Sequence, residues 1–196
     1  MSKLMIAEVS IEGLRPLLFH VFGPEALPLE KQERTGVPGN DPEEWRQTHT
    51  ATKQGQLYLR SDYAFSCLIN GARYEKLKRG SLMPLMQSTL QVLDDILLLD
   101  RWMPAEPLPT DPDSPVYLDI RSVRNPSTKG RNVRYRVACS PGWHLSFHAS
   151  FDSTIVSREA FTASLLNAGQ LVGIGDGRSI GMGRFEVLDC QFSNGA

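Results

Sequence analysis

Apolar and polar side chains alternate with a period of two residues at both ends of the chain, which predicts β-strands there. Residues 5–12 alternate in this way, and we expect this strand to run on to Phe19, with Pro16 marking a bend or an edge. Residues 143–151 alternate without a break, with apolar side chains on one face and histidine or serine on the other. A last strand is expected over residues 185–192.

The middle of the chain predicts three further strands. Residues 95–102 form a short apolar run that is typical of a buried strand. Residues 116–123 and 132–139 are rich in β-forming side chains, and the polar segment between them contains proline and glycine. This pattern predicts a β-hairpin with a flexible tip. The five prolines within residues 103–115 predict an extended loop before it.

Two segments have the period of an amphipathic helix. In residues 61–80 apolar side chains at i, i+3, i+4 and i+7 form one stripe, residues 61–62 can cap the start, and Gly80 can end the helix. A second helix is expected between Ser157 as its cap and Gly169 as its end. Its inward-facing side chains are expected to be Phe161, Leu165 and Leu166.

Residues 23–56 differ from the rest of the chain because they hold four prolines, ten charged residues and few large apolar side chains. A structureless loop of this length is unusual inside a compact domain. It is either a functional arm or a disordered insertion. The whole order is strand, arm, helix, strand, hairpin, strand, helix, loop, strand. This order predicts one α+β domain over residues 1–196 with a ferredoxin-like (RRM-like) core, interrupted by the arm and by a hairpin over residues 116–139.

Composition places the chain among ordinary globular proteins, with 41% hydrophobic and 22% charged residues. No apolar run approaches the ~18 residues of a membrane-spanning helix. Three widely spaced cysteines favour a reducing compartment, and the cytoplasm is the expected location. They form neither a disulfide framework nor a zinc pattern, and we expect no metal and no cofactor.

The net charge of −1 conceals a strong division along the chain. Residues 121–136 contain six basic residues and no acid, which leaves 15 basic and 22 acidic residues elsewhere. A basic hairpin on an acidic body favours a single surface that faces nucleic acid. The alternative is an exposed edge hairpin that its charges keep soluble.

The densest local signal is the glycine-rich run GIGDGRSIGMGRFEV at residues 173–187. It either presents backbone N–H groups to phosphates or makes a tight crossover without a ligand. A dinucleotide-binding fingerprint requires a strand before the loop and a helix after it. Here the predicted order is the reverse, so this class of site is rejected.

The run GDGRSIGMGRFEV resembles the C-terminal glycine-rich signature of the repeat-associated mysterious protein (RAMP) superfamily, whose members are subunits of CRISPR effector complexes and their relatives. Gly71, Ala72 and Arg73 in GQLYLRSDYAFSCLINGARYEK are similar to the family's helix segment, and the first strand before a long arm is a weaker match. The acid in Arg60-Ser61-Asp62 departs from the family pattern, which usually has a small residue and a serine there.

The resemblance is greatest to the backbone-forming subunits. It implies a non-catalytic subunit that binds single-stranded guide RNA, forms a homo-oligomer along the strand and contacts other effector subunits, with no membrane partner. The residues alone leave open whether the strand is RNA or DNA. The expected nucleic-acid contacts are one flank of the first helix, the basic hairpin and the glycine-rich loop: Ser66, Asn70, Arg73, Arg121, Arg124, Lys129, Arg131, Arg134, Arg136, Gly177, Arg178, Ser179, Gly181, Gly183 and Arg184.

Two other functions stay open. A guide-RNA-processing ribonuclease of the same fold would use a histidine as general base without metal, with His20 or His148 as the candidates. His144 and His148 share one strand face, where histidines are usually only polar side chains. A protein-only assembly module, whose arm swaps between subunits, is the second alternative.

Overall fold

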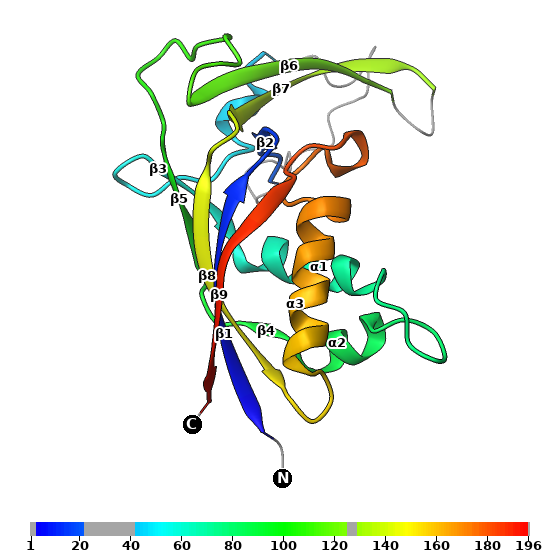
Figure 1. Ribbon diagram of the computed structural model, residues 1–196. Helices are drawn as coiled ribbons and strands as arrows, with labels where there is room; N and C mark the ends of the chain where they lie inside the picture. The colour runs from blue at the N-terminus through cyan, green and yellow to red at the C-terminus, as the bar shows by residue number, and fades with distance from the viewer. Residues whose placement is uncertain (1–2, 22–41, 125–128, 196) are drawn as a thin grey trace, which may run out of the picture.

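The computed structural model describes residues 3–21, 42–124 and 129–195. It confirms an α+β fold with antiparallel sheets and, among the described residues, three α-helices (Figure 1). The main sheet has the strand order β3-β5-β8-β1-β9, and the short strand β4 pairs with β8. Its strands are β1 (Leu4–Gly13), β3 (Gln56–Arg60), β4 (Gln91–Val92), β5 (Ile96–Trp102), β8 (His144–Asp152) and β9 (Phe185–Asn194).

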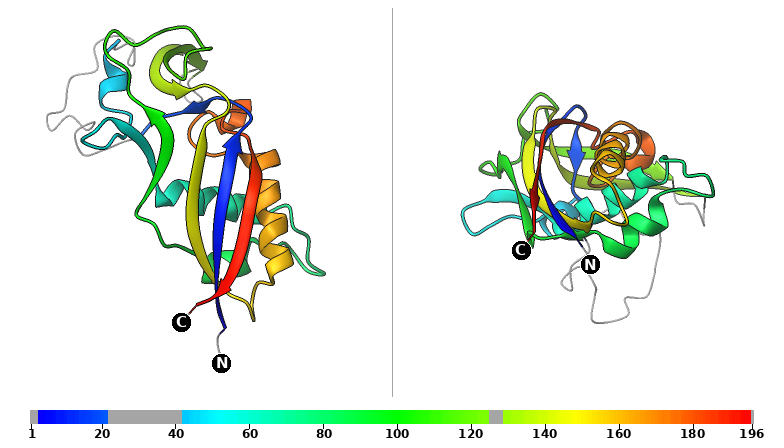
Figure 2. Two further views of the ribbon diagram at one scale, coloured as in Figure 1. Left: turned by 60° about the vertical axis from the view of Figure 1, so that its left-hand side comes forward. Right: turned by 60° about the horizontal axis from the view of Figure 1, so that its bottom comes forward.

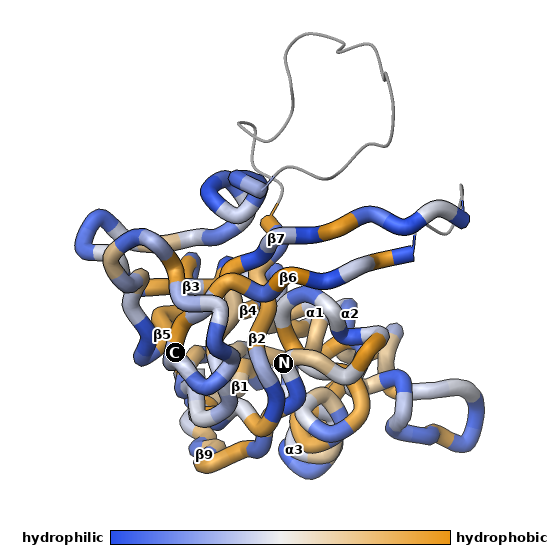
Figure 3. Tube along the Cα trace, turned by 90° about the horizontal axis from the view of Figure 1, so that it is seen from above, coloured by the Kyte–Doolittle hydropathy of each residue, from blue (hydrophilic) through white to orange (hydrophobic). Residues whose placement is uncertain are grey.

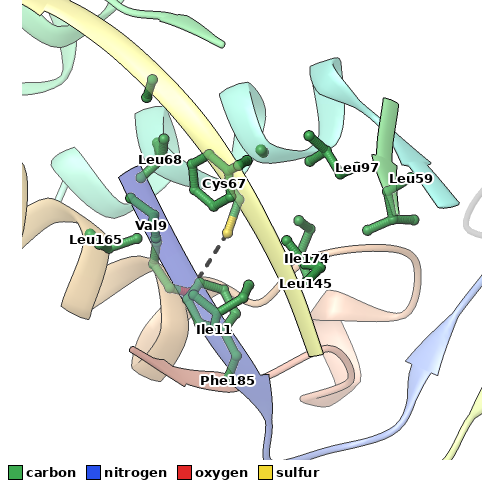
Figure 4. Packing of buried hydrophobic residues seen from close by; sticks show 14 of the residues in the cluster. Val9, Ile11, Leu59, Cys67, Leu68, Leu97, Leu145, Leu165, Ile174 and Phe185 are labelled. Atoms are coloured by element: carbon green, nitrogen blue, oxygen red, sulfur yellow. Dashed lines mark hydrogen bonds between the residues drawn. The ribbon is translucent and has the colours of Figure 1, made fainter. Parts of the chain in front are cut away.

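The helices of the described residues all lie on one face of this sheet, as the turned views in Figure 2 show. They are α1 (Ser61–Ala72), α2 (Met83–Thr89) and α3 (Arg158–Asn167). The core lies between the two layers, where Val9, Cys67 and Leu165 pack together (Figure 4). The predicted alternation of β8 is confirmed at its inward positions, because Leu145, Phe147, Ala149 and Phe151 are buried. Strand β5 is buried only at every second residue, so the prediction of a fully buried strand is wrong.

A second sheet lies across one end of the molecule (Figures 1 and 3). Its order is β2-β7-β6, with β2 at Leu17–Leu18, β6 at Val116–Arg124 and β7 at Arg131–Cys139. The β6–β7 hairpin confirms the prediction for residues 116–139, and its register runs without a shift from Val116 opposite Cys139 to Arg124 opposite Arg131. The predicted flexible tip falls at residues 125–128, outside the described residues.

The first strand ends earlier than predicted. Strand β1 stops at Gly13, where a side chain would collide with the Trp143 ring at 2.0 Å. The backbone then bends, because the amides of Leu14 and Arg15 both donate to the carbonyl of Arg184. The next apolar pair becomes β2 and joins the second sheet. One apolar run therefore serves two sheets, which alternation alone could not show.

The first helix is also shorter than predicted. It ends at Ala72, not at Gly80, because beyond Ala72 the apolar stripe ceases and Tyr74 and Leu77 are exposed. The chain instead turns back, with a bridge between Lys76 and Ser81. Neither Ser61 nor Asp62 caps the start; the N-cap is Arg60, without a side-chain cap hydrogen bond.

The second predicted helix is confirmed at its start and corrected at its end. Ser157 Oγ accepts a hydrogen bond from the Ala160 amide at 3.2 Å, as an N-cap does. The helical path continues past Gly169 through a π turn at Ala168–Val172 and ends at Gly173 in the left-handed region. Gly169 packs against the Phe185 backbone, where a Cβ would lie 2.3 Å from the carbonyl oxygen. Leu166, expected inside, is exposed.

Most of the predicted arm, residues 23–41, lies outside the described residues. The part from residue 42 onward is built into the fold. It contains a 3-10 turn, η2 (Glu44–Arg46), whose Trp45 is buried in the core. Among the residues that the structure describes, no helix is long and apolar enough to cross a membrane.

Candidate nucleic-acid interface

A groove of about 770 Å³ lies between the β6–β7 hairpin and the glycine-rich loop. It brings together two of the three segments that the sequence predicted to contact nucleic acid. Five arginines and one acidic residue line it, so its walls are strongly cationic. The lining residues are His20, Arg121, Ser122, Val123, Arg124, Arg134, Arg136, Gly175, Asp176, Gly177, Arg178, Ser179 and Ile180.

Strand alternation explains why three of the four hairpin arginines reach this groove from one face. The fourth, Arg124, has the other parity and enters the lining at the last residue of β6. Directly opposite residues of an antiparallel pair point to the same face, and so do residues two apart on one strand. Arg121 is opposite Arg134, and Asp119 is opposite Arg136, so these four side chains share one face of the hairpin. The opposite face carries Leu118, Tyr135 and Val137, which pack against the main core.

The cationic face changes character along its length. At its base, Tyr117 and Ala138 form a buried apolar cluster with Leu18 and Met182, which holds the hairpin against the glycine-rich loop. One step further along, Arg136 is buried, with only 4% of its surface exposed. Beyond it, the walls open at Arg134 and Arg121. The face therefore runs from an apolar anchor through a buried cation to an open cationic groove.

The glycine-rich loop crosses beneath the hairpin in a path that side chains would block. Gly175 and Gly183 both have positive φ, and a Cβ on Gly183 would lie 1.7 Å from the Ile174 carbonyl oxygen. Gly177 and Gly181, both in the left-handed region, bracket the 3-10 turn η4 (Arg178–Ile180). This turn is what places Arg178 and Ser179 in the groove wall.

Three of the five groove arginines have an acidic partner. Arg136 Nη1 lies 2.5 Å from Asp176 Oδ2, and Arg121 Nε lies 2.6 Å from Asp119 Oδ1. In each of these two pairs, one side chain is buried and the other is partly exposed.

Arg134 pairs with Glu44, whose carboxylate also accepts the Tyr135 amide at 3.4 Å. Arg124 and Arg178 have no acidic partner within ion-pair distance in the described part of the chain. They are the groove cations most available to a ligand.

His20 lies among these charges in the groove lining. Burial lowers the pKa of its imidazole below the ordinary value of 6.5, and Arg134 and Arg136 act in the same direction. The carboxylates of Asp176 and Glu44 oppose this shift without cancelling it. His20 is therefore mainly neutral at pH 7, where it can accept as well as donate a hydrogen bond.

The predicted contact residues divide into three groups. Arg121, Arg124, Arg134, Arg136, Gly177, Arg178 and Ser179 line the groove together. Ser66 of α1 adjoins them, since Arg178 Nη1 lies 3.5 Å from its Oγ. The groove lining does not include the remaining seven: Asn70, Arg73, Lys129, Arg131, Gly181, Gly183 and Arg184. Nucleic-acid contact stays a prediction for the residues of all three groups.

Sequence reasoning missed the acids that organise the groove. Glu44 is 90 residues from its partner Arg134, and Asp176 is 40 residues from Arg136, so no periodic pattern links them. The one available signal was Asp176, the single acid among the closely spaced glycines of residues 173–183.

The other candidate, His148, and its neighbour His144 lie on the face of the main sheet that points away from the helices, outside the groove lining. His144 Nδ1 is 3.1 Å from Asp100 Oδ2, and His148 Nδ1 is 3.2 Å from Asp94 Oδ2. The amide of each histidine also donates to the same aspartate, at 2.7 Å for His144 and 2.5 Å for His148. These aspartates link β8 to the chain around β5, where the two strands pair only at Leu99 and Leu145 among the described residues. The role of these contacts is therefore structural.

Comparison with known proteins gives a likeness of fold. No protein-family model and no curated protein sequence matches the chain. Among solved structures, a chain in the cryo-EM structure of the Type III-B Cmr-beta bound to cognate target RNA superposes with a TM-score of 0.52 at 12% sequence identity. The match covers 99% of this chain and 62% of that chain, so this chain spans under two thirds of its neighbour's length.

Proposed function

We propose that this protein binds single-stranded RNA in the arginine-lined groove as a non-catalytic subunit of a CRISPR-type effector complex. The observation that carries the proposal is the convergence of Arg121, Arg124 and Arg178 on one groove from two segments that are far apart in the sequence. Groove cations neutralise phosphates without reading sequence, which suits a strand of any sequence. The fold likeness to a chain of an RNA-bound Cmr-beta structure supports the same setting.

We further assign the main sheet to the ferredoxin-like arrangement. Taken as four strands, its order is β9-β1-β8-β5, and α1 and α3 each connect two strands that a third strand separates. Such a split βαβ pair is the pattern that defines this arrangement. In this assignment, β3, β4 and the second sheet are additions to the core, and the glycine-rich loop connects the helical layer to the last strand.

We also propose that copies of this chain line up along the strand and contact other effector subunits. The charge distribution supports such an array of copies. Each chain has a hairpin with six basic residues, although its net charge is only −1. A bound strand would supply the negative charge that lets the cationic faces of neighbouring copies approach one another. Nucleic acid that co-purifies with large assemblies would agree with this, whereas large particles free of nucleic acid would favour the protein-only assembly module.

The direct test is fluorescence anisotropy of a labelled single-stranded RNA, titrated with the purified protein over a series of salt concentrations. Each neutralised phosphate contributes roughly −0.7 to the slope of log affinity against log salt for a single strand. The double variant R124E/R178E should bind far more weakly and with a flatter slope. The matched control K78E/R79E reverses two exposed cations between α1 and α2, outside the groove lining, and should bind like the parent. Absence of RNA binding by the parent at low salt would refute the proposal.

A metal-independent ribonuclease remains the second candidate, because a mainly neutral His20 lies in the cationic groove. A neutral imidazole could accept a proton from a 2′-hydroxyl while arginines neutralise the phosphate. This candidate expects the parent to cleave a hairpin RNA without metal and His20→Ala to lose the cleavage. An intact RNA after prolonged incubation with the parent would remove it.

A further inference from the structure

A second, smaller hollow of about 180 Å³ opens beside the groove. Asp62, Tyr63 and Ser66 of α1 form one side, and Arg178 forms the other. Arg178 is also part of the groove lining, so the two spaces share this side chain. The hollow has less than a quarter of the groove's volume, so it is too small for a length of strand and suits one flat group.

The chemistry of the hollow differs from that of the groove. Among the described residues that line the groove there is no aromatic side chain other than His20, whereas the lining of the hollow includes both the Tyr63 ring and the Arg178 guanidinium. The Tyr63 side chain is half-buried against the core, which fixes the position of its ring. Burial, Asp62 and Asp176 raise the pKa of its hydroxyl, and Arg60 and Arg178 oppose that shift. The hydroxyl thus lies within electrostatic reach of the glycine-rich loop, close to the groove.

A cationic groove by itself binds phosphates but offers no surface on which the bases can stack. Proteins that bind single strands combine such a groove with aromatic or guanidinium planes on which bases stack. Arg178 has no acidic partner within ion-pair distance among the described residues, and the one side-chain hydrogen bond of its guanidinium there is to the Ser66 hydroxyl, at 3.5 Å. It can therefore contact a phosphate on its groove side or present its plane to a base on the other side.

We propose that the hollow is a nucleobase site, in which one unstacked base of the bound strand lies between the Tyr63 ring and the Arg178 guanidinium. This inference rests on the proposed function, because it places the base next to phosphates held in the groove. The site accepts any base, since every base has a π face. The Ser66 hydroxyl lies 3.5 Å from Arg178 Nη1, so Ser66 is next to the side chain that the base site and the groove share.

The test uses two ligands of equal charge: a single-stranded RNA and an abasic ribose-phosphate strand of the same length. On RNA, Tyr63→Leu should lose roughly 5- to 150-fold in affinity, the usual loss on removing one stacking partner. Its salt slope should match that of the parent, because no phosphate contact is removed. On the abasic strand, the parent and Tyr63→Leu should bind equally, and Tyr63→Phe should behave like the parent on both ligands.

Phe65→Leu is the matched control, since it removes another half-buried aromatic ring from α1 that lies outside both hollows. It should bind both ligands as the parent does. Equal binding of RNA by Tyr63→Leu and the parent would overturn the base site and leave the proposed function intact. A loss of equal size on RNA and on the abasic strand would also overturn it, because a distorted fold or a lost phosphate contact would be the cause. A parent that binds neither ligand would refute the proposed function itself.

Discussion

The Arg136 guanidinium donates to the Asp176 carboxylate across 2.5 Å, and this pair joins strand β7 to the glycine-rich loop at the closed end of the groove. The arginine side chain is only 5% exposed, and the aspartate side chain is 35% exposed. The Nε atom of Arg136 is buried without a hydrogen-bond partner among the described residues, so Asp176 is its main compensation. An asymmetric ion pair therefore joins the hairpin to the loop, next to the apolar cluster at the base of the hairpin.

Because the two side chains differ in exposure, we expect that removing one or the other lowers the free energy of unfolding by different amounts. Asp176→Ala leaves a buried guanidinium without its acid, and removing one partner of a fully buried pair costs ~3–5 kcal/mol. We expect somewhat less here, because Asp176 is partly exposed. Arg136→Met leaves an aspartate that water can solvate, and should cost clearly less. Urea unfolding of both variants checks the order, and an equal or reversed order would contradict it.

Glu44 is the acidic partner of the groove arginine Arg134, so a phosphate would compete with it for that guanidinium. Its carboxylate takes both the Arg134 guanidinium and the Tyr135 amide, as a phosphate oxygen pair could. Glu44→Gln removes the competing charge, so RNA affinity should rise by roughly fivefold, the equivalent of about 1 kcal/mol. Anisotropy titration measures the change. Glu43→Gln, on the neighbouring exposed acid that pairs with Arg46, is the control and should leave affinity unchanged. Weaker binding by Glu44→Gln would show that Glu44 positions Arg134 instead of blocking it.

His20 should make the protein less stable in weak acid. Its folded-state pKa is lowered below 6.5, so between that lowered value and 6.5 the unfolded chain binds more protons than the folded one. The contribution of His20 to stability is complete above 6.5 and is lost as the pH falls through this window. His20→Gln should therefore flatten the fall in the free energy of unfolding between about pH 7.5 and pH 5. Denaturant titrations of parent and variant at several pH values give the difference, and parallel curves would refute the prediction.

Two glycines of the loop should respond very differently to alanine. Gly183 has a φ of 65°, and a Cβ there would lie 1.7 Å from the Ile174 carbonyl oxygen, so Gly183→Ala should cost at least about 3 kcal/mol. Gly181 has a φ of 82° but open space around it, so Gly181→Ala should cost only the backbone strain, about 1–2 kcal/mol. Thermal unfolding distinguishes them, and equal costs would contradict the steric argument.

Local patterns predicted the elements of this fold well. The alternation in residues 143–151 and the Ser157 cap both describe interactions within a few residues, and the structure has both. Errors arose where a distant residue decided the outcome. Trp143 ends β1 at Gly13, and Phe185 packs on Gly169 within a helical path that local signals would have ended there.

The sequence predicted the arginines of the candidate site but not the acidic residues that pair with them. A run of basic residues is visible in the sequence, and the charge division along the chain pointed to Arg121, Arg134 and Arg136, which all line the groove. Their acids come from elsewhere in the chain, and only folding shows which arginines they neutralise. From the sequence, the six basic residues of the hairpin could not be told apart. In the structure Arg134 is paired with Glu44, whereas Arg124 has no acidic partner among the described residues and is more available to a phosphate.

The unbroken register of the β6–β7 hairpin means that odd and even positions are constrained separately. Deleting one residue from β7 beside Tyr135 would exchange its two faces, turning arginines toward the core and core side chains toward the groove. Insertions or deletions of two residues would preserve the faces and only change how far the arginine row extends. A change of hairpin length by an even number of residues thus keeps each side chain on its face, whereas an odd number does not. Related chains could therefore extend the row of arginines in steps of two residues.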